Sequence, residues 1–536
     1  MQFNLADLFE SIVDARPDKT VLVCDQRRLS FAELDARANR LAHYWQSCGI
    51  GRGDHVGLQL RNGSEFIEGM LAAFKIRAVP ININFNYVEA ELAYIYDNAD
   101  LAGLVCHPEF LDRAAPVASQ QATLRSLLVV EDAATAADPP GWVRYEEALA
   151  GASDERAFEE RSGDDLYIIY TGGTTGMPKG VMWRHEDIFF AAMGGGDPDY
   201  SKGPISAPEE LVQRIPDMDM AALPAPPLMH AAAQWLAMNT LFAAGTLVLP
   251  ASGVFDPARI LRAVGDEKVI LIVIVGDAMA IPLCDELQAN PDKYDMSSLF
   301  AVASGGALFS PATKKRVMEL LPGRMIVDGL GSSETGAMGN KMSAGDGDAD
   351  EPRFVVGEHM TVLGDDDLPV QPGSGVVGRL AKKGRVPLGY YKAPEKSSQT
   401  FVEIDGERWA IPGDMASVEA DGTILLRGRD STSINTGGEK VFPEEVEAVL
   451  KSHRAIADTV VVGVPDDRWG NIVVAVYSSP DGDDLDLEDL KTYCRGRIAG
   501  YKIPRALVRV ERIKRSPAAK ADYPWAREQA LAGLAL

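Results

Sequence analysis

Cysteine, histidine and positive charge are scarce in this sequence, and each shortage excludes a class of protein. The 536 residues hold five scattered cysteines without a C-x-x-C pair and seven histidines without an H-x-x-x-H pair. Neither a disulfide framework nor a structural zinc site is therefore expected. The net charge of −25 would repel a nucleic-acid backbone or an anionic membrane surface overall. We expect reduced thiols and no nucleic-acid partner.

Long apolar runs are missing as well. No run approaches the roughly 18 residues that a membrane-spanning helix needs, so we predict no integral membrane segment. The first residues, MQFNLADLFESIVDARPDK, are interrupted by charges and are not typical of a signal peptide. Together these features predict a cytoplasmic protein.

Short apolar runs alternate with helical patterns through the first third of the chain. Thr20–Cys24, His55–Leu60 and Val79–Ile83 are predicted strands, and Ser30 with Glu33 forms a capping box in front of an amphipathic helix. Strands that alternate with helices indicate parallel sheets covered on both faces. The length exceeds that of a single core, so several domain-sized units are expected.

A glycine- and threonine-rich loop, Tyr170–Gly180, follows the apolar run Leu166–Tyr170, which reads as a buried strand. Glycine permits backbone angles that turn several amide N–H groups toward one anion, and threonine and lysine add further donors. The loop is therefore suited to hold a phosphate chain. The residues that would do so are Thr171, Gly172, Gly173, Thr174, Thr175, Gly176 and Lys179.

Two other interpretations of this loop are a flexible surface turn and a Walker P-loop. The Walker pattern needs glycine directly before its lysine and Ser/Thr directly after it, whereas Pro178 and Gly180 flank Lys179. The loop instead resembles the phosphate loop of the adenylate-forming superfamily, usually Y-T-S-G-T-T-G-x-P-K-G. Gly172 stands in place of the serine of that pattern.

Three later stretches resemble motifs of the same superfamily. Pro227–His230 is similar to the P-L-F-H element beside the acyl pocket. Ser304–Ala307 resembles a turn that runs under adenine, and Asp328–Gly336, DGLGSSETG, resembles Y-G-x-T-E. The resemblance implies that Glu334, with Thr174, holds Mg²⁺. It implies nucleotide contacts from Ser304, Gly305, Gly306, Ala307, Asp328, Gly329, Leu330, Gly331, Ser332 and Ser333.

Two residues of the last motif depart from the pattern. Leu330 replaces the tyrosine that stacks on adenine in the family, and Ser333 replaces the threonine that contacts the α-phosphate. Serine keeps the hydroxyl, whereas leucine offers apolar contact without aromatic stacking. We read Asp328–Gly336 as a glycine turn that presents the Glu334 carboxylate to a hard cation.

The C-terminal part carries the remaining family motifs. Asp414 resembles the aspartate that accepts hydrogen bonds from the ribose hydroxyls, and Arg429 the arginine that reaches the same sugar. Asp430–Ser433 is short and polar, as a hinge requires, with serine at the usual pivot position, Ser431. The turn that follows resembles the one lining the pantetheine tunnel: Gly437, Gly438, Glu439 and Lys440.

Arg515–Lys520 resembles P-R-x-x-x-G-K, whose lysine contacts the acid and the α-phosphate. Taken singly, His230, Glu334 and Lys520 are more often structural or solvent-facing side chains. Because ordered motifs cover nearly the whole chain, we assign catalytic roles to Lys520, Glu334, Thr174 and His230. No Ser–His–Asp or Cys–His arrangement is evident in the sequence.

The resemblance implies an α/β fold with a large N-terminal adenylation domain of mixed and parallel sheets, residues 1–429. A hinge, 430–433, and a small mobile α+β domain, 434–536, complete it. The expected activity is that of an acyl-CoA synthetase: ATP and a hydrophobic carboxylic acid give acyl-AMP and pyrophosphate, and CoA then takes the acyl group and releases AMP. ATP/AMP, Mg²⁺ and CoA are the implied ligands.

Two alternatives stay open at this point. One is an acyl-AMP ligase that passes its adenylate to a carrier protein, and the other is a non-catalytic nucleotide-binding relative. The expected acid is large and uncharged, because the residues near His230 and Met279 are apolar and small. The sequence decides neither the acid, whether fatty, aromatic or steroid side-chain, nor the oligomeric state, a homodimer included.

Overall fold

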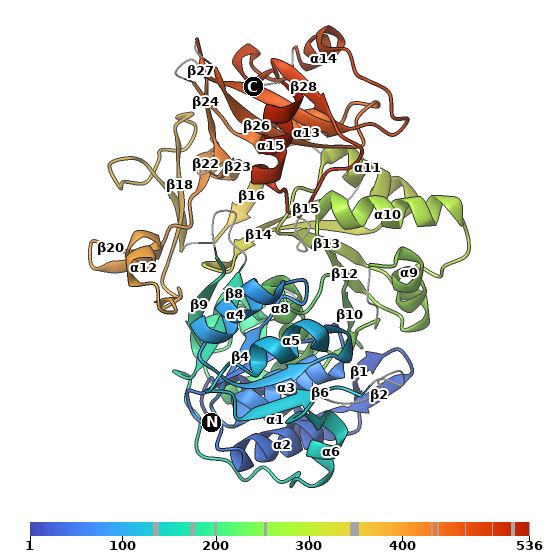
Figure 1. Ribbon diagram of the computed structural model, residues 1–536, viewed down its shortest axis with the longest axis vertical. Helices are drawn as coiled ribbons and strands as arrows, with labels where there is room; N and C mark the ends of the chain where they lie inside the picture. The colour runs from blue at the N-terminus through green and yellow to red at the C-terminus, as the bar shows by residue number, and fades with distance from the viewer. Residues whose placement is uncertain are drawn as a thin grey trace.

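Parallel strands with helices on both sides form the N-terminal part of the protein, as the alternating pattern predicts (Figure 1). The computed structural model describes residues 1–131, 139–171, 177–197, 201–250, 255–343, 353–357, 359–429, 432–436, 439–466, 468–495, 497–515 and 520–534. Within these ranges, no helix is long and apolar enough to cross a membrane.

A five-stranded parallel sheet lies in the first part of the chain. Every residue of its β3 and β5 strands is buried, as is usual for strands covered on both faces. The strand order is β4 (Val79–Asn82), β3 (His55–Gln59), β5 (Leu101–Cys106), β6 (Ser126–Val129) and β7 (Val143–Arg144). The helices of this region are α1 (Leu5–Ala15), α2 (Phe31–Ser47), α3 (Ser64–Lys75), α4 (Glu89–Asn98), α5 (Leu111–Ala118) and α6 (Tyr145–Ala150).

A fifteen-stranded mixed sheet extends from the N-terminal part to the upper half of the molecule (Figure 1). Its strands run parallel from β1 through β14, with β2 as an antiparallel edge strand, and antiparallel from β14 onward. The parallel section comprises β1 (Thr20–Cys24), β11 (Thr246–Val248), β10 (Ala221–Pro224), β12 (Leu271–Ile274), β13 (Ala301–Gly305) and β14 (Met325–Ser332), with β2 (Arg27–Ser30) at its edge.

The antiparallel section begins with β15 (Gly336–Ser343), so the direction changes at the turn that carries Glu334. Its other strands are β16 (Arg353–Val356), β17 (Met360–Leu363), β18 (Val377–Lys383), β20 (Phe401–Ile404), β21 (Glu407–Ala410), β22 (Asp414–Val418) and β23 (Ile424–Arg429). A separate antiparallel sheet contains β8 (Leu166–Thr171), β9 (Lys179–Arg184) and β19 (Gly389–Tyr390). The helices of these sections are α7 (His185–Ala192), α8 (Ala231–Phe242), α9 (Pro257–Asp266), α10 (Gly276–Ala289), α11 (Pro311–Leu320) and α12 (Pro394–Thr400).

The C-terminal part is a small α+β unit with its own core. Alternate valines of β26 face opposite sides: Val461 packs in one apolar cluster, and Val460 and Val462 pack in another. This unit contains the hairpin β24 (Ile434–Thr436) and β25 (Glu439–Val441), the sheet β26 (Asp458–Asp466), β27 (Gly470–Ser478) and β28 (Ala506–Arg509), and the helices α13 (Pro443–Lys451), α14 (Leu487–Cys494) and α15 (Tyr523–Gly533). Short 3₁₀ turns occur at Pro108–Phe110, Gly194–Gly196, Pro208–Arg214 and Gly500–Lys502.

Two local predictions have different outcomes. The capping box is confirmed, because the Glu33 N–H donates to Ser30 Oγ at 3.2 Å and the Ser30 N–H donates to Glu33 Oε2 at 2.7 Å. The prediction of one glycine turn across Asp328–Gly336 is wrong in extent. Asp328–Ser332 continues strand β14, and only the residues between β14 and β15 form the turn. Ladder pairing with β13 and β15 holds these small residues in the strand.

Three N-terminal helices meet at a buried ammonium group. Lys75, at the end of α3, is fully buried, and its Nζ lies 2.5 Å from Glu10 Oε1 of α1 and 2.7 Å from Asp35 Oδ1 of α2. Without the Lys75 ammonium group, the Glu10 and Asp35 carboxylates would stay buried away from water, and each would lose one charged partner.

We predict that Lys75→Met lowers the free energy of unfolding of the N-terminal part by about 3–5 kcal/mol. Urea denaturation followed by the fluorescence of the buried Trp45 measures the change. Lys19→Met is the control, because the Asp219 carboxylate that pairs with Lys19 is 93% exposed, and we expect a change below about 1 kcal/mol. Equal effects of both substitutions would contradict a dominant role for the buried group.

Candidate active site

The predicted phosphate loop connects two antiparallel strands. Thr171 ends β8 and pairs with Lys179 at the start of β9, so both residues stand at the base of the loop. Gly172, Gly173, Thr174, Thr175 and Gly176 lie outside the described residues, and their roles stay predictions. Thr171 and Lys179 are both partly exposed, so they can reach a ligand.

Asn82 joins the base of this loop to the segment of His230. Its side-chain amide donates to the Tyr170 carbonyl at 2.8 Å and to the Met229 carbonyl at 2.7 Å, and its Oδ1 accepts from the Tyr170 N–H at 2.7 Å. His230 caps the N-terminal end of α8 and is partly exposed. The sequence prediction missed Asn82. A lone amide side chain at the end of an apolar strand was the available signal.

The two stretches predicted to contact adenine lie side by side. β13 and β14 are parallel neighbours, with Ser304 opposite Asp328 and Gly305 opposite Gly329. A Cβ atom on Gly305 would lie 3.3 Å from the Gly329 carbonyl oxygen, so glycine allows this close approach. Gly306, with φ +81°, and Ala307 follow in the turn after β13.

Asp328 and Leu330 both point away from open solvent. Burial raises the pKa of the Asp328 carboxyl, against the opposing effect of Lys314, whose Nζ lies 2.5 Å from Asp328 Oδ2. Leu330 is 8% exposed and packs in an apolar cluster with Met338, Phe354 and Leu380. Its predicted contact with adenine stays a prediction. Lys314 was not predicted, because its distance in sequence from Asp328 gives no periodic signal.

The turn that carries Glu334 is held by buried donors on three other elements. Trp183 Nε1 of β9 donates to the Ser333 carbonyl at 3.0 Å. Lys382 Nζ of β18 donates to the Thr335 carbonyl at 2.7 Å and to the Ala337 carbonyl at 3.0 Å. The Tyr390 hydroxyl of β19 donates to Glu334 Oε1 at 3.0 Å.

The same turn is also fixed from within. The fully buried Thr335 hydroxyl accepts from the Ser332 N–H at 3.1 Å. Gly336 adopts a positive φ of +68°, and a Cβ atom there would meet the Ala191 carbonyl oxygen at 2.6 Å. The Glu334 carboxylate therefore stands on a rigid support at the point where the large sheet changes direction.

Asp414 and Arg429 form one pair across β22 and β23. They are opposite each other in the ladder, and Arg429 Nε donates to Asp414 Oδ1 at 3.0 Å. The Asp414 charge is the main cause that raises the pKa of Arg429. The pair fits the predicted grip on ribose, which needs an accepting carboxylate held in a fixed direction.

Lys520 of the C-terminal unit faces Glu334, Asp414 and Arg429. Loss of hydration and the Arg429 charge lower the pKa of the Lys520 ammonium group, while Glu334 and Asp414 act to raise it. Because the Lys520 side chain is exposed at its surface, water weakens these influences, and they indicate that the four charged groups lie near one another. The structure thus brings Lys520 to the predicted metal and ribose residues.

Four residues were predicted to line the pantetheine tunnel, and two of them, Glu439 and Lys440, lie on β25 of the C-terminal unit. Glu439 and Lys440 are exposed there, and Lys440 Nζ is 6.0 Å from the centre of the Phe442 ring. Gly437 and Gly438 lie outside the described residues. The role of Glu439 and Lys440 toward CoA stays a prediction.

Glu334 fits a role as a Mg²⁺ ligand. Within the part of the chain that the structure describes, no three histidine, cysteine or carboxylate side chains gather as a complete metal cage. Mg²⁺ commonly binds one or two carboxylates and completes its shell with phosphate oxygens and water. The partly exposed Glu334 carboxylate meets that requirement.

An apolar cavity of about 240 Å³ lies beside Met229, at the ends of β10 and β11. Met229 and Met279, both in the predicted acyl region, contribute to its wall with Leu223, Phe255 and Ile260. The lining also includes Arg61, Asn62, Phe85, Asn86, Pro224, Ala225, Pro227, Pro250, Asp256 and Arg259. The lining suits an uncharged organic chain.

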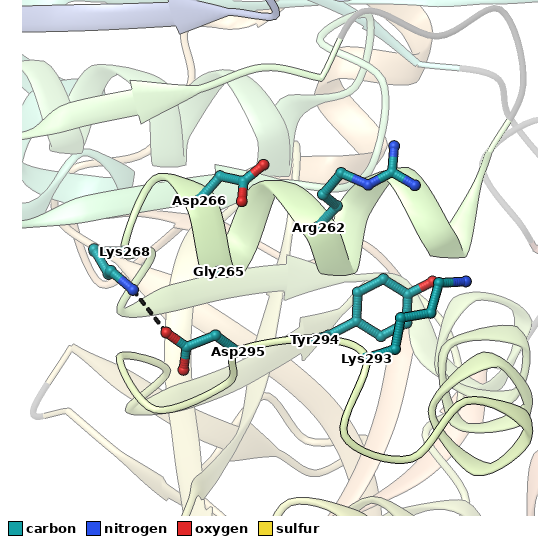
Figure 2. Close-up of a pocket in the computed structure, with 7 residues that line it drawn as sticks. All are labelled: Arg262, Gly265, Asp266, Lys268, Lys293, Tyr294 and Asp295. Atoms are coloured by element: carbon teal, nitrogen blue, oxygen red, sulfur yellow. Dashed lines mark hydrogen bonds and ion pairs between the residues drawn. The ribbon is translucent and has the colours of Figure 1, made fainter.

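A second hollow, of about 450 Å³, is an open surface depression between α9 and the segment after α10 (Figure 2). It is lined by Arg262, Gly265, Asp266, Lys268, Lys293, Tyr294 and Asp295. Lys268 points toward Asp295, and their charged groups lie 2.7 Å apart. Lys293 pairs with Glu286 outside the lining, and none of the predicted site residues lines the depression, so we assign it no function.

Comparison with protein families and curated proteins gives full-length matches. Residues 9–391 match the model "AMP-binding enzyme", and residues 445–520 match "AMP-binding enzyme C-terminal domain". The chain is 47% identical to 3-oxocholest-4-en-26-oate–CoA ligase of Rhodococcus rhodochrous, over 99% of this chain and 96% of that protein. It is 46% identical to a medium/long-chain-fatty-acid–CoA/3-oxocholest-4-en-26-oate–CoA ligase of Mycobacterium marinum, over 98% and 96%.

Solved structures share the fold. The anthranilate CoA ligase AuaEII in complex with anthranoyl-AMP superposes with a TM-score of 0.84 at 22% identity, over 99% of this chain and 98% of that one. ATP-bound MatB from Rhodopseudomonas palustris gives 0.81 at 24% identity, over 98% and 99%. The predicted α/β architecture is confirmed. Because the relatives are named CoA ligases, the comparisons favour CoA over a carrier protein as acyl acceptor.

The pH dependence of stability tests the burial of Lys382, whose side chain donates to the turn that carries Glu334. The Lys382 side chain is buried without a carboxylate partner among its described contacts, and burial lowers its pKa to about 8. In the unfolded chain the pKa returns to about 10.4. Between these values the unfolded state binds more protons, so the free energy of unfolding rises with pH.

We therefore predict that wild type gains stability over Lys382→Met as pH rises from about 8 to 10, by up to about 1.4 kcal/mol per pH unit. Urea denaturation at pH 7, 8, 9 and 10 measures this difference. Lys383→Met is the matched control: Lys383 lies next in the strand, is 31% exposed and pairs with Glu407, so its difference from wild type should stay nearly constant. If the difference in free energy of unfolding between wild type and Lys382→Met did not change with pH, the lowered pKa of Lys382 would be contradicted.

Proposed function

Since the chain belongs to the AMP-binding enzyme family and is an AMP-forming acid–thiol ligase, we propose how its two parts divide the reaction. The large domain, 1–429, holds ATP and the acid, and the small domain, 434–536, delivers Lys520. The observation that carries this proposal is that Lys520 lies within electrostatic reach of Glu334, Asp414 and Arg429.

The first step activates a carboxylate that is otherwise a poor acyl donor. Its oxygen attacks the α-phosphorus of ATP, and pyrophosphate leaves. Catalysis of such a transfer depends on positioning and charge stabilisation, so no protein nucleophile is needed. Lys520 places a positive charge between the acid and the α-phosphate. Thr171, Thr174, Thr175 and Lys179, with the glycines Gly172, Gly173 and Gly176, hold the phosphate chain.

The nucleoside is held from two sides. Asp414 accepts from the ribose hydroxyls, with Arg429 fixing its direction at 3.0 Å. The paired segments Ser304–Ala307 and Asp328–Ser333 form the adenine side. Glu334 and Thr174 are the protein ligands for Mg²⁺, which supplies charge neutralisation on the phosphates when bound. His230 borders the acid and orients its carboxylate.

The second step needs Lys520 to leave and the pantetheine thiol of CoA to enter. Rotation of the small domain about residues 430–433 provides both, and Gly437, Gly438, Glu439 and Lys440 would then face the thiol path. The sulfur attacks the acyl carbon, and AMP leaves with the electron pair of the broken acyl–phosphate bond. A cytoplasmic location stays a prediction from the sequence, and the oligomeric state, a homodimer included, stays open.

The acid is proposed to be a large hydrophobic carboxylic acid, either a medium- or long-chain fatty acid or a steroid side-chain acid. The cavity beside Met229 supports this class through the apolar side chains in its lining, which include Leu223, Met229, Phe255, Ile260 and Met279. The names of the relatives at 46–47% identity point to the same acids.

We predict that Lys520→Ala lowers acid-dependent pyrophosphate release by about 10²–10³-fold, because a charge that stabilises the transition state is removed. Thioester formation from CoA and supplied acyl-adenylate should stay near the wild-type rate. Lys514→Ala is the control in the same segment: Lys514 is 61% exposed and pairs with Asp522, so both half-reactions should survive. Equal losses in both half-reactions of Lys520→Ala would refute its assigned role.

A panel of acids with ATP, Mg²⁺ and CoA, scored by AMP formation, tests the substrate class. We expect the highest kcat/KM for C8–C18 fatty acids or a C27 steroid acid, since apolar side chains make up most of the cavity lining. Malonate and benzoate are the comparison acids, one doubly charged and the other small. A kcat/KM for either that exceeds those of all the hydrophobic acids would overturn the proposed class.

A further inference from the structure

A buried ion pair joins the small domain to the large one away from Lys520. Lys451 ends α13, and its Nζ lies 3.4 Å from Oδ2 of Asp277, in the first turn of α10. The two side chains are 6% and 7% exposed. Figure 1 shows α13 close to α10 and α11, where the two domains meet.

On the large domain, Asp277 is tied to the predicted adenine turn. Its Oδ1 accepts from the Ser310 N–H at 2.9 Å and from the Ser310 hydroxyl at 3.1 Å. The neighbouring Gly276 N–H donates to Ser304 Oγ at 2.9 Å. The carboxylate that meets Lys451 is therefore fixed to the two ends of the segment that contains Ser304–Ala307.

On the small domain, ion pairs connect Lys451 to Arg515, which begins the segment 515–521 that carries Lys520 (the Lys520 segment). The Lys451 Nζ also lies 3.3 Å from Asp458 Oδ1. Asp458 receives two hydrogen bonds from Arg515, at 2.8 and 2.6 Å, and Arg515 pairs with Ala521 directly after Lys520. Asp277, Lys451, Asp458 and Arg515 thus form a continuous row of alternating charges from the nucleotide side to the Lys520 segment.

This row passes from the small domain to the large one at Asp277, which Lys451 contacts directly and whose charge also acts, against the effect of burial, to raise the pKa of Arg515. Lys451 is about 12 Å from the start of α13, since each helical residue rises 1.5 Å. A rotation about residues 430–433 moves Lys451 and the base of the Lys520 segment together, because Asp458 and Arg515 connect them. A swing that withdraws Lys520 therefore also separates Lys451 from Asp277.

We propose that Lys451 and Asp277 form an ion pair specific to the adenylate-forming orientation, which makes Lys451 a positioning residue for Lys520. The inference rests on the proposed rotation of the small domain. Separation takes one of two carboxylates from Lys451 and the ammonium group from Asp277, while Asp458 and Ser310 stay as polar partners, so the pair biases the domain toward the orientation in which Lys451 and Asp277 are in contact. Lys451 itself does not touch the reacting atoms.

The test measures both half-reactions of full-length Lys451→Met. We expect acid-dependent pyrophosphate release to fall at least tenfold, while thioester formation from supplied acyl-adenylate stays equal to wild type or rises. Retention of the second activity also reports that the variant is folded. Lys451→Arg should recover most of the adenylation rate, because it keeps the charge. Lys491→Met is the matched control, since Lys491 pairs with Glu488 inside α14, and it should change neither rate.

A double-variant comparison separates the ion pair from other effects of Lys451. Asp277→Asn keeps an oxygen for Ser310 but removes the charge, so it should also slow adenylation selectively. Lys451→Met with Asp277→Asn should then lose little more than either single variant. Fully additive losses, or equal losses in both half-reactions, would overturn the proposal.

The same assays distinguish failure of the ion pair from failure of the proposed function. If Lys520→Ala retains adenylation, the proposed function itself fails. If only Lys451→Met behaves as wild type, the ion pair alone fails.

Discussion

The position of the Lys520 ammonium group depends on how the small domain and the large domain meet. Lys520 belongs to the small unit, yet the charges that act on it, those of Glu334, Asp414 and Arg429, belong to the large one. Arg429 repels Lys520, so the arrangement is favourable only while the two carboxylates, or the phosphates of a bound nucleotide, balance both cations. An anion placed near Lys520 and Arg429 would therefore stabilise this arrangement.

The electrostatic role of Glu334 in turn requires a rigid base. Its turn joins the last parallel strand of the large sheet to the first antiparallel one, so the backbone there cannot be satisfied by continuous ladder pairing. Trp183 and Lys382 supply the missing donors from neighbouring strands. The carboxylate is then held in place before a ligand arrives, which is the preorganisation that charge stabilisation needs.

Patterns of residues predicted much of the fold, because strands and helices depend on local chemistry, whereas the nucleotide contacts, implied by the family resemblance, stay predictions. The run Leu166–Tyr170 predicts a buried strand, and glycines beside it predict close backbone approach. Contacts between distant segments could not be predicted in this way. Lys382 and Lys383 look alike in the sequence, but strand alternation buries the first beneath the Glu334 turn and leaves the second beside Glu407 at the surface.

The role of Lys451 could not be predicted from the sequence either, because its partner Asp277 is distant along the chain. A lysine in the last turn of a helix is ordinarily explained by the helix dipole. Here its distance to Asp277 is 3.4 Å and to Asp458 3.3 Å, so the ammonium group is shared between the two domains. When the domains part, Asp458 remains with Lys451 and Ser310 remains with Asp277. Neither charge is then left without a polar partner, and the contact can favour one orientation without preventing the other.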